Sequence, residues 1–192
     1  MTILVTGGAG FIGSNFILEW LSLKDEKVVN VDKLTYAGNL SNLEPVSKNK
    51  DYFFEKADIC DFLRINQLVD KYKPRAIIHF AAESHVDRSI KGPSEFISTN
   101  ILGTFNLLEI VRKKYESRYI NNDFRFIHIS TDEVYGSLGI EENPFTEKNQ
   151  YCPNSPYSAS KASSDHLVRS YFKTYGVPSI ITNCSNNYGP YQ

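Results

Sequence analysis

Short apolar runs alternate with longer segments of helical periodicity along all 192 residues of the chain. Strand-like composition marks residues 2–6, 28–32, 52–56, 76–80, 124–130 and 178–183. Helical spacing of apolar residues marks the intervening segments 11–23, 61–72, 93–116 and 156–175. Such alternation favours parallel strands joined by right-handed crossovers. The sequence therefore predicts an α/β fold: a doubly wound, Rossmann-type parallel sheet of about six strands with helices on both faces.

Charge and composition narrow the class of protein. The 21 Lys and Arg residues are balanced by 22 Asp and Glu residues, so the basic excess typical of nucleic-acid binders is missing. Apolar stretches are too short to span a bilayer, and the first apolar run is too short for a signal sequence. Cys60, Cys152 and Cys184 lack metal-binding spacing and indicate reduced thiols. We expect a cytoplasmic protein with no nucleic-acid partner, no membrane partner and no metal site.

A glycine-rich turn separates the first expected strand from the first expected helix. The run from Gly7 to Gly13 fits two spacings of three glycines, one starting at Gly7 and one starting at Gly8. Glycines let the backbone approach a pyrophosphate at a helix N-terminus. Asp32 follows about twenty residues later at the end of the second strand, where a carboxylate binds the adenosine ribose hydroxyls. The pattern predicts NAD rather than NADP, although the positive charge of Lys33 would weaken that preference.

Two further groups carry the expected chemistry. Tyr157 and Lys161 are four residues apart in a helix that Pro156 starts, so the lysine ammonium is expected close to the phenol, where it would favour phenolate. A phenolate can remove a hydroxyl proton while hydride leaves the same carbon. Asp132 and Glu133 follow the fifth strand and add an acid and a base for eliminating water. The pattern predicts oxidation followed by dehydration.

At this point the chain resembles the extended short-chain dehydrogenase/reductases, and within them the dTDP-glucose 4,6-dehydratase subfamily. The segments that match that subfamily in order are TGGAGFIGS, VDKLTYAGNL, AAESHVDRSI, STDEVYG, YSASK and NNYGPYQ. Related epimerases share the glycine motif and the Tyr-x-x-x-Lys spacing, but usually have small residues in place of Asp132 and Glu133. The two acids therefore indicate a dehydratase.

The resemblance implies a role for each catalytic residue. Tyr157 takes the proton of the sugar's 4-hydroxyl, Thr131 hydrogen-bonds the same hydroxyl, and Lys161 holds the ribose and tunes the phenol. Glu133 then removes the C-5 proton while Asp132 protonates the departing C-6 hydroxyl. Hydride passes from C-4 to NAD and returns to C-6, which gives a 4-keto-6-deoxy sugar.

The resemblance also implies the binding residues. NAD contacts are expected from Gly7, Gly10, Phe11, Ile12, Gly13, Asp32, Lys33, Leu34, Thr35, Asp58, Ile59, Phe80, Ala81, Ala82, Ser84, Thr99, Tyr157, Lys161 and Asn187. Substrate contacts are expected from Ser84, Thr131 and Asn186. No catalytic role is expected for His85, Asp87 or Arg88, and His79 is expected to be a hydrogen-bonded core histidine.

Family members continue into a C-terminal domain that holds the nucleotide of the substrate, and the resemblance places that domain beyond residue 192. We expect residues 1–192 to form the NAD-binding domain with all the catalytic residues, and to form a homodimer through the helices at 93–116 and 156–175. Two other hypotheses stay open. One is a sugar-nucleotide 4-epimerase, and the other is a truncated NAD-binding and dimerisation module without turnover.

Overall fold

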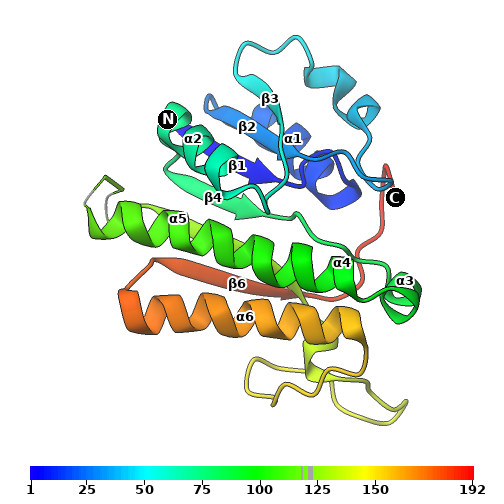
Figure 1. The fold of residues 1–192 in the computed structure, drawn as a ribbon. Helices are drawn as coiled ribbons and strands as arrows, with labels where there is room; N and C mark the ends of the chain where they lie inside the picture. Colours follow the sequence, from blue (N-terminus) through cyan, green and yellow to red (C-terminus); the bar gives the residue numbers. More distant parts are fainter. Residues whose placement is uncertain (118, 121–122) are drawn as a thin grey trace.

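The computed structural model describes residues 1–117, 119–120 and 123–192 and contains a six-stranded parallel sheet (Figure 1). Its strands are β1 (Thr2–Thr6), β2 (Lys27–Asp32), β3 (Tyr52–Lys56), β4 (Ala76–His79), β5 (Arg125–Thr131) and β6 (Ser179–Cys184). Their order is β3-β2-β1-β4-β5-β6, and each neighbouring pair is parallel. This confirms the predicted doubly wound fold. It also brings the carboxyl ends of all these strands to one edge of the sheet.

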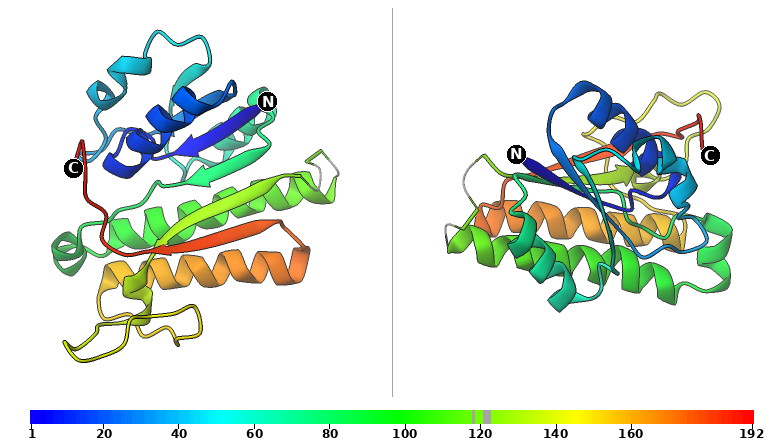
Figure 2. Two further views of the ribbon diagram at one scale, coloured as in Figure 1. Left: turned by 180° about the vertical axis from the view of Figure 1, so that it is seen from behind. Right: turned by 90° about the horizontal axis from the view of Figure 1, so that it is seen from above.

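Helices pack on both faces of the sheet (Figure 2). Helices α2 (Phe62–Tyr72), α5 (Thr104–Glu116) and α6 (Pro156–Tyr175) cover one face, and α1 (Phe11–Leu23) with the 3₁₀ helix η1 (Leu40–Val46) covers the other. Strand β1 shows why both faces are apolar. Leu4 packs with α2, α5 and α6, whereas Ile3 and Val5 pack with α1, and all three are fully buried. Alternate side chains of a strand point to opposite faces, so a strand covered on both sides is apolar throughout.

The predicted strands agree with the observed ones to within one residue at each end. The predicted helices also agree with the observed ones, except for the helix predicted at 93–116. That segment is divided into α4 (Ser94–Phe96), the π-helical segment η2 (Ile97–Gly103) and α5. Sequence patterns also gave no indication of η1 and two short helices, α3 (Val86–Lys91) and η3 (Asp132–Tyr135). Segment 137–155 has no helix or strand, as expected of a surface loop.

The π-helical turn follows from contacts that lie far away in the sequence. Asn100 is buried in this turn, and its side-chain amide donates to the Glu83 carbonyl at 2.9 Å and to the Ser160 hydroxyl at 2.8 Å. Its side-chain oxygen accepts a hydrogen bond from the Glu83 amide at 2.8 Å. Asn100 therefore ties the loop after β4 to α6. Local apolar spacing carries no trace of these partners, so it predicted an uninterrupted helix.

Two further findings concern the whole described part of the chain. Its helices include none that is long and apolar enough to cross a membrane. Cys60, Cys152 and Cys184 are free cysteines.

Candidate active site

A cleft of about 930 Å³ lies at the carboxyl edge of the sheet. Its wall is built by segments that follow all six strands, which is where doubly wound folds bind ligands. The cleft brings together every residue expected at the site except Leu34 and Asp132. Residues 185–192 complete one side of it by running from β6 back to α1 (Figure 1), where Asn15 donates a hydrogen bond to the Pro190 carbonyl at 2.8 Å. Asn186 and Asn187 lie on this returning segment and line the cleft.

The glycine turn forms one end of the cleft. Its structure shows which of the two glycine patterns, the one starting at Gly7 or the one starting at Gly8, faces the cleft. Gly7, Gly10 and Gly13 line the cleft, whereas Gly8 is buried against Asn30 and Ile17. Gly7 has a φ of +73°, and a Cβ there would lie 2.5 Å from the Ala81 amide nitrogen. A Cβ on Gly13 would overlap the Gly7 carbonyl oxygen. The spacing that starts at Gly7 therefore faces the cleft, and Gly8 serves the packing of β1 on β2 and α1.

Helix α1 starts at this turn with its N-terminus toward the cleft. Its N-cap is Gly10, which has no side chain to satisfy the first backbone N–H groups of the helix. Those N–H groups and the positive end of the helix dipole favour an anion at this place. Phe11 and Ile12 of the first turn line the cleft beside them. This end of the site fits a diphosphate.

Asp32 ends β2 and faces the cleft, and the backbone fixes its carboxylate. Oδ2 accepts a hydrogen bond from the Ala9 amide at 3.0 Å, and Oδ1 accepts one from the Leu34 amide at 2.8 Å. Leu34 has a φ of +59° and is not among the residues that line the cleft, although the sequence predicts it as a cofactor contact. Its backbone orients Asp32 instead.

Lys33 lies toward the neighbouring strand β3. Its Nζ is 3.4 Å from Asp58 Oδ2 and 3.4 Å from Thr99 Oγ1. Lys33, Asp58 and Thr99 all line the cleft together with Ile59 and Thr35. On the floor after β4, the small residues Ala81 and Ala82 leave room beside Phe80 and Ser84. These positions agree with the expected path of a dinucleotide across the strand ends.

The other end of the cleft holds the residues with acid–base chemistry. Thr131 ends β5 and caps η3, since its Oγ1 accepts a hydrogen bond from the Glu133 amide at 3.2 Å. This cap brings Thr131 and Glu133 to the cleft wall and leaves Asp132 outside it, where Asp132 Oδ1 lies 3.5 Å from Thr131 Oγ1. Direct contact of Asp132 with the cleft, as the sequence predicted, is therefore not observed.

Tyr157 is placed by the start of α6. Ser155 and Ser158 form a capping box, and Pro156 occupies the first helical position, so Tyr157 lies in the first turn as predicted. Its ring packs edge-on against Phe96 with centroids 6.3 Å apart. Both Tyr157 and Lys161 line the cleft.

The electrostatics differ from the sequence expectation at the phenol. The pKa of Tyr157 is raised to about 12, first by burial and then by the charge of Glu133, while a hydrogen bond with Thr131 acts in the opposite direction. The Lys161 ammonium donates to the Ile129 carbonyl at 2.6 Å. In this arrangement the charge of Lys161 does not outweigh the burial of the phenol and the charge of Glu133. A further positive charge is needed beside Tyr157 to favour phenolate near neutral pH.

Glu133 has the environment of a general base. Burial raises the pKa of its carboxyl group, and the neighbouring Asp132 raises it further. A carboxylate with a raised pKa binds a proton more tightly than an ordinary glutamate, so it removes one from carbon more readily. Glu133 thus places a candidate proton acceptor close enough to Tyr157 for its charge to raise the pKa of the phenol.

His79 lies in the core and His85 lies in the cleft. His79 is buried, as expected, with its ring nitrogens 2.7 Å from the Thr6 hydroxyl and 2.9 Å from the Thr104 hydroxyl. Because Thr104 donates its proton to the Asn100 carbonyl, His79 Nε2 must carry the hydrogen.

His85 and Asp87 line the cleft, and the part of the chain that the structure describes has no His, Cys, Asp and Glu group able to hold a metal.

Some cleft residues were missed by the sequence reasoning. Tyr36 reaches across the mouth of the cleft, with the Arg88 guanidinium 3.7 Å from its ring centre and Glu83 Oε2 3.4 Å from its hydroxyl. Cys184 at the end of β6 also lines the cleft. Tyr36 lies within the segment VDKLTYAGNL, and Cys184 is the last residue of β6. Their positions at or after the ends of strands could have predicted that they line the cleft.

The comparisons with known proteins agree with this geometry. The family model described as GDP-mannose 4,6 dehydratase matches residues 4–192. The chain belongs to this family. It is 56% identical to dTDP-glucose 4,6-dehydratase of Salmonella typhimurium over 201 residues, which cover all of this chain and 56% of that protein. It is 59% identical to the Neisseria meningitidis protein of the same name, over 98% of this chain and 54% of the relative.

Solved structures of similar proteins show the same fold. The chain superposes with a TM-score of 0.91 on DesIV, a dTDP-glucose 4,6-dehydratase from Streptomyces venezuelae with NAD and TYD bound, at 46% identity. A UDP-glucose 4-epimerase from Thermus thermophilus in complex with NAD gives a TM-score of 0.87 at 31% identity. All of this chain is covered in both comparisons, but only 58% of the first structure and 57% of the second. The chain thus spans about half the length of the curated relatives it matches.

Proposed function

We propose that the protein catalyses the NAD-dependent 4,6-dehydration of dTDP-glucose to dTDP-4-keto-6-deoxyglucose. The observation that carries this proposal is the position of Glu133, a partly buried carboxyl group with a raised pKa that lines the same cleft as Tyr157. A simple oxidation and reduction at C-4 needs Tyr157 alone. Relatives that are 55% to 59% identical and bear the name dTDP-glucose 4,6-dehydratase support the choice of substrate.

The cleft residues fit NAD. The glycine turn gives a diphosphate close access to the backbone, and a Cβ added to Gly10 would make only van der Waals contact with the Gly7 carbonyl oxygen, at 3.4 Å. Asp32 presents a fixed carboxylate to the ribose hydroxyls and would repel a 2′-phosphate. Bound NAD would accept hydride from C-4 of the sugar and return it to C-6. Its nicotinamide cation would also supply the positive charge that Tyr157 needs.

Tyr157 and Thr131 carry out the proton chemistry of the oxidation. We assign removal of the 4-hydroxyl proton to Tyr157, and Thr131 hydrogen-bonds the same oxygen. Lys161 adds its ammonium charge to this end of the cleft and holds the ribose. Ser84 and Asn186 line the cleft where they can bind the sugar.

Glu133 and Asp132 carry out the elimination. The ketone at C-4 acidifies the C-5 proton, which Glu133 removes, and Asp132 protonates the departing C-6 hydroxyl. Since Asp132 lies outside the cleft wall beside Thr131, its side chain must turn toward the substrate to act. We therefore assign the C-5 base role to a preformed group and the C-6 acid role to a group that moves.

Incubating the purified protein with NAD and dTDP-glucose tests the function. A product lighter by one water supports the dehydratase. A product of unchanged mass with inverted C-4 supports the 4-epimerase, in which Asp132 and Glu133 would have no role. Absence of product from protein that retains NAD supports a cofactor-binding module.

The expected homodimer stays a proposal, together with the cytoplasmic location and the assignment of residues 1–192 as the NAD-binding domain. Large apolar side chains exposed on the two expected interface helices support the dimer, namely Ile97, Leu102, Phe105 and Phe172, which are 40% to 53% exposed. Light scattering on the wild-type protein and on a Phe105→Glu variant tests it. A dimer that the variant converts to monomer agrees with the proposal, and a wild-type monomer contradicts it.

A further inference from the structure

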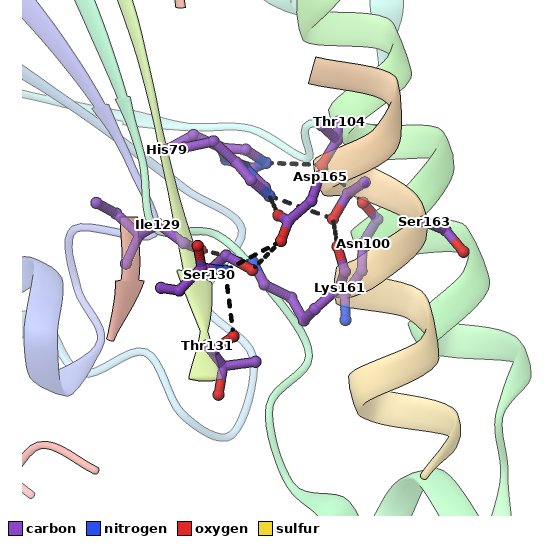
Figure 3. A network of polar contacts seen from close by, with 12 residues as sticks. His79, Asn100, Thr104, Ile129, Ser130, Thr131, Lys161, Ser163 and Asp165 are labelled. Atoms are coloured by element: carbon purple, nitrogen blue, oxygen red, sulfur yellow. Dashed lines mark hydrogen bonds and ion pairs between the residues drawn. The ribbon is translucent and has the colours of Figure 1, made fainter. Parts of the chain in front are cut away.

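Asp165 is a buried carboxylate on α6, one helical turn after Lys161 (Figure 3). Its Oδ2 accepts three hydrogen bonds: from the Ser130 hydroxyl at 2.8 Å, the Tyr151 hydroxyl at 3.0 Å and the Asn183 amide at 3.3 Å. These donors come from β5, the 137–155 loop and β6. One oxygen therefore joins three segments directly behind the cleft.

His128 is not the counter-charge of this carboxylate. Its Nε2 lies 3.2 Å from Asp165 Oδ1, but it lies equally close to the Ser164 hydroxyl. Ser164 donates its own proton to the Lys161 carbonyl at 2.8 Å, so it is free to accept the proton of His128 Nε2. Burial and then the charge of Lys161 lower the pKa of His128 to about 4. The imidazole is therefore neutral at pH 7, so its Nε2, although 3.2 Å from Oδ1, brings no positive charge to Asp165.

Lys161 is the positively charged residue that we pair with Asp165. It is 4% exposed, and the two side chains are four residues apart on the same face of α6. Lys161 bonds the Ile129 carbonyl and Asp165 bonds the Ser130 side chain, so both contact consecutive residues of β5. Burial lowers the pKa of Lys161 to about 8, and Asp165 is the largest influence in the opposite direction.

Packing alone does not require a charge at position 165. Ser130, Tyr151 and Asn183 all donate to Oδ2, and the carbonyl oxygen of an asparagine could accept the same bonds. A buried charge is costly unless an opposite charge compensates it. The carboxylate is thus better explained by what it does for its charged neighbour.

We propose that Asp165 is a positioning residue whose negative charge keeps the buried Lys161 in its ammonium form at the catalytic end of the cleft. This inference rests on the proposed function for the role of Lys161 in the reaction. The charge relation between the two side chains does not depend on that role. It can be measured with no substrate present.

The titration of Lys161 tests the proposal directly. The protein is labelled with ¹³C-lysine, and the Cε signal of Lys161 is identified by its loss in a Lys161→Arg variant. We expect the titration midpoint of that signal to fall by about one pH unit or more in Asp165→Asn, because an opposite charge one helical turn away has been removed. Tyr151→Phe is the matched control, since it removes a hydrogen bond to Asp165 and leaves the charge. Its midpoint should stay within a few tenths of the wild-type value.

Other titratable groups that face this pair are kept unchanged in the comparison. They come from β4, β5, β6, η3, α6 and the 137–155 loop, and they are His79, His128, Glu133, Tyr135, Tyr151, Tyr157 and Cys184. Because each is present in the wild-type protein and in Asp165→Asn, a shift between the two reports the charge at position 165.

An unchanged Lys161 midpoint in Asp165→Asn would overturn the proposal. If Asp165→Asn does not fold, the double variant Lys161→Met/Asp165→Asn decides, since it removes both buried charges together. Recovery of the folded state supports charge pairing, and failure to fold assigns Asp165 to packing alone. If the wild-type protein forms no product, the proposed function is contradicted. The titration of Lys161 and the folding of the double variant would still test the charge pairing.

Discussion

The Asp32 carboxylate accepts a hydrogen bond from the Ala9 amide at 3.0 Å, which joins the end of β2 to the glycine turn after β1. Its second oxygen is held by the Leu34 amide at 2.8 Å. Each carboxylate oxygen keeps a further lone pair for the ribose hydroxyls of a dinucleotide. One side chain therefore joins β2 to the turn, and we expect the same side chain to select the cofactor.

Replacing Asp32 by Asn tests this double role. The amide keeps one acceptor but loses the charge, and hydrogen bonds to charged groups contribute about 1.5–3 kcal/mol. We expect NAD affinity, measured by calorimetric titration, to fall about tenfold or more, with a smaller ratio of NAD to NADP affinity. Asp51→Asn, which removes an equal charge outside the cleft, should change neither. An unchanged NAD to NADP ratio in Asp32→Asn contradicts the assigned role.

Two glycines of the same turn should respond differently to alanine. A Cβ on Gly13 overlaps the Gly7 carbonyl, so Gly13→Ala should lower the free energy of unfolding by about 1–3 kcal/mol. A Cβ on Gly10 meets nothing closer than 3.4 Å, so Gly10→Ala should cost about 1 kcal/mol or less. It should still weaken NAD binding about tenfold or more, because the methyl group fills the space beside the diphosphate site. Urea unfolding and NAD titration of both variants measure these effects, and equal loss of stability would refute the distinction.

The pH dependence of C-5 proton removal should report Glu133. A base acts when ionised, so deuterium uptake at C-5 should rise with pH and level off above the pKa of Glu133, which burial and then Asp132 raise. Asp132→Asn removes the like charge, so the rising limb should move to lower pH. Glu133→Gln should slow the exchange about 10²–10⁴-fold with unchanged NAD affinity. If the pH profile of deuterium uptake is the same in Asp132→Asn as in the wild-type protein, the charge of Asp132 does not affect the pKa of Glu133.

Stability should fall in mild acid, and His128 is one of two sources. The other is His79, whose pKa burial lowers well below its ordinary value, and its share of the loss persists in a His128 variant. The pKa of His128 is lowered to about 4 in the folded protein, first by burial, whereas the unfolded chain titrates near 6.5. The stabilisation is thus complete above about pH 6.5 and is lost as the pH falls toward 4, by about 2 kcal/mol at pH 5. Urea unfolding at pH 8 and pH 5 measures this loss of unfolding free energy. We expect the loss to be smaller in His128→Asn and to equal the wild-type loss in His166→Asn, which replaces an exposed histidine. Equal losses in both variants would exclude His128 as a source.

The strands and the cofactor end of the site could be predicted because they depend on local patterns. Apolar alternation located β1 to β6, and the glycine spacing with Asp32 predicted residues that line one end of the cleft. The capping residues Ser155 and Pro156 correctly set the start of α6. Each of these signals lies within a few residues of the feature that it predicts.

Prediction from the sequence failed where distant segments decide the outcome. The π-helical turn at Asn100 depends on Glu83 and Ser160, and the direction of the Lys161 ammonium depends on the Ile129 carbonyl. The four-residue spacing correctly placed Tyr157 and Lys161 on one helix but could not show that burial raises the pKa of the phenol. Asp165 lies in the same helix, and no local pattern indicated its network with β5 and β6.

The most direct measurement of the central claim uses dTDP-glucose with deuterium at C-4. Incubated with the protein and NAD, it should give a product that has lost one water and carries the deuterium at C-6. Glu133→Gln should form no such product. A product of unchanged mass that keeps its deuterium at C-4 would contradict the assignment of Asp132 and Glu133 to the elimination of water.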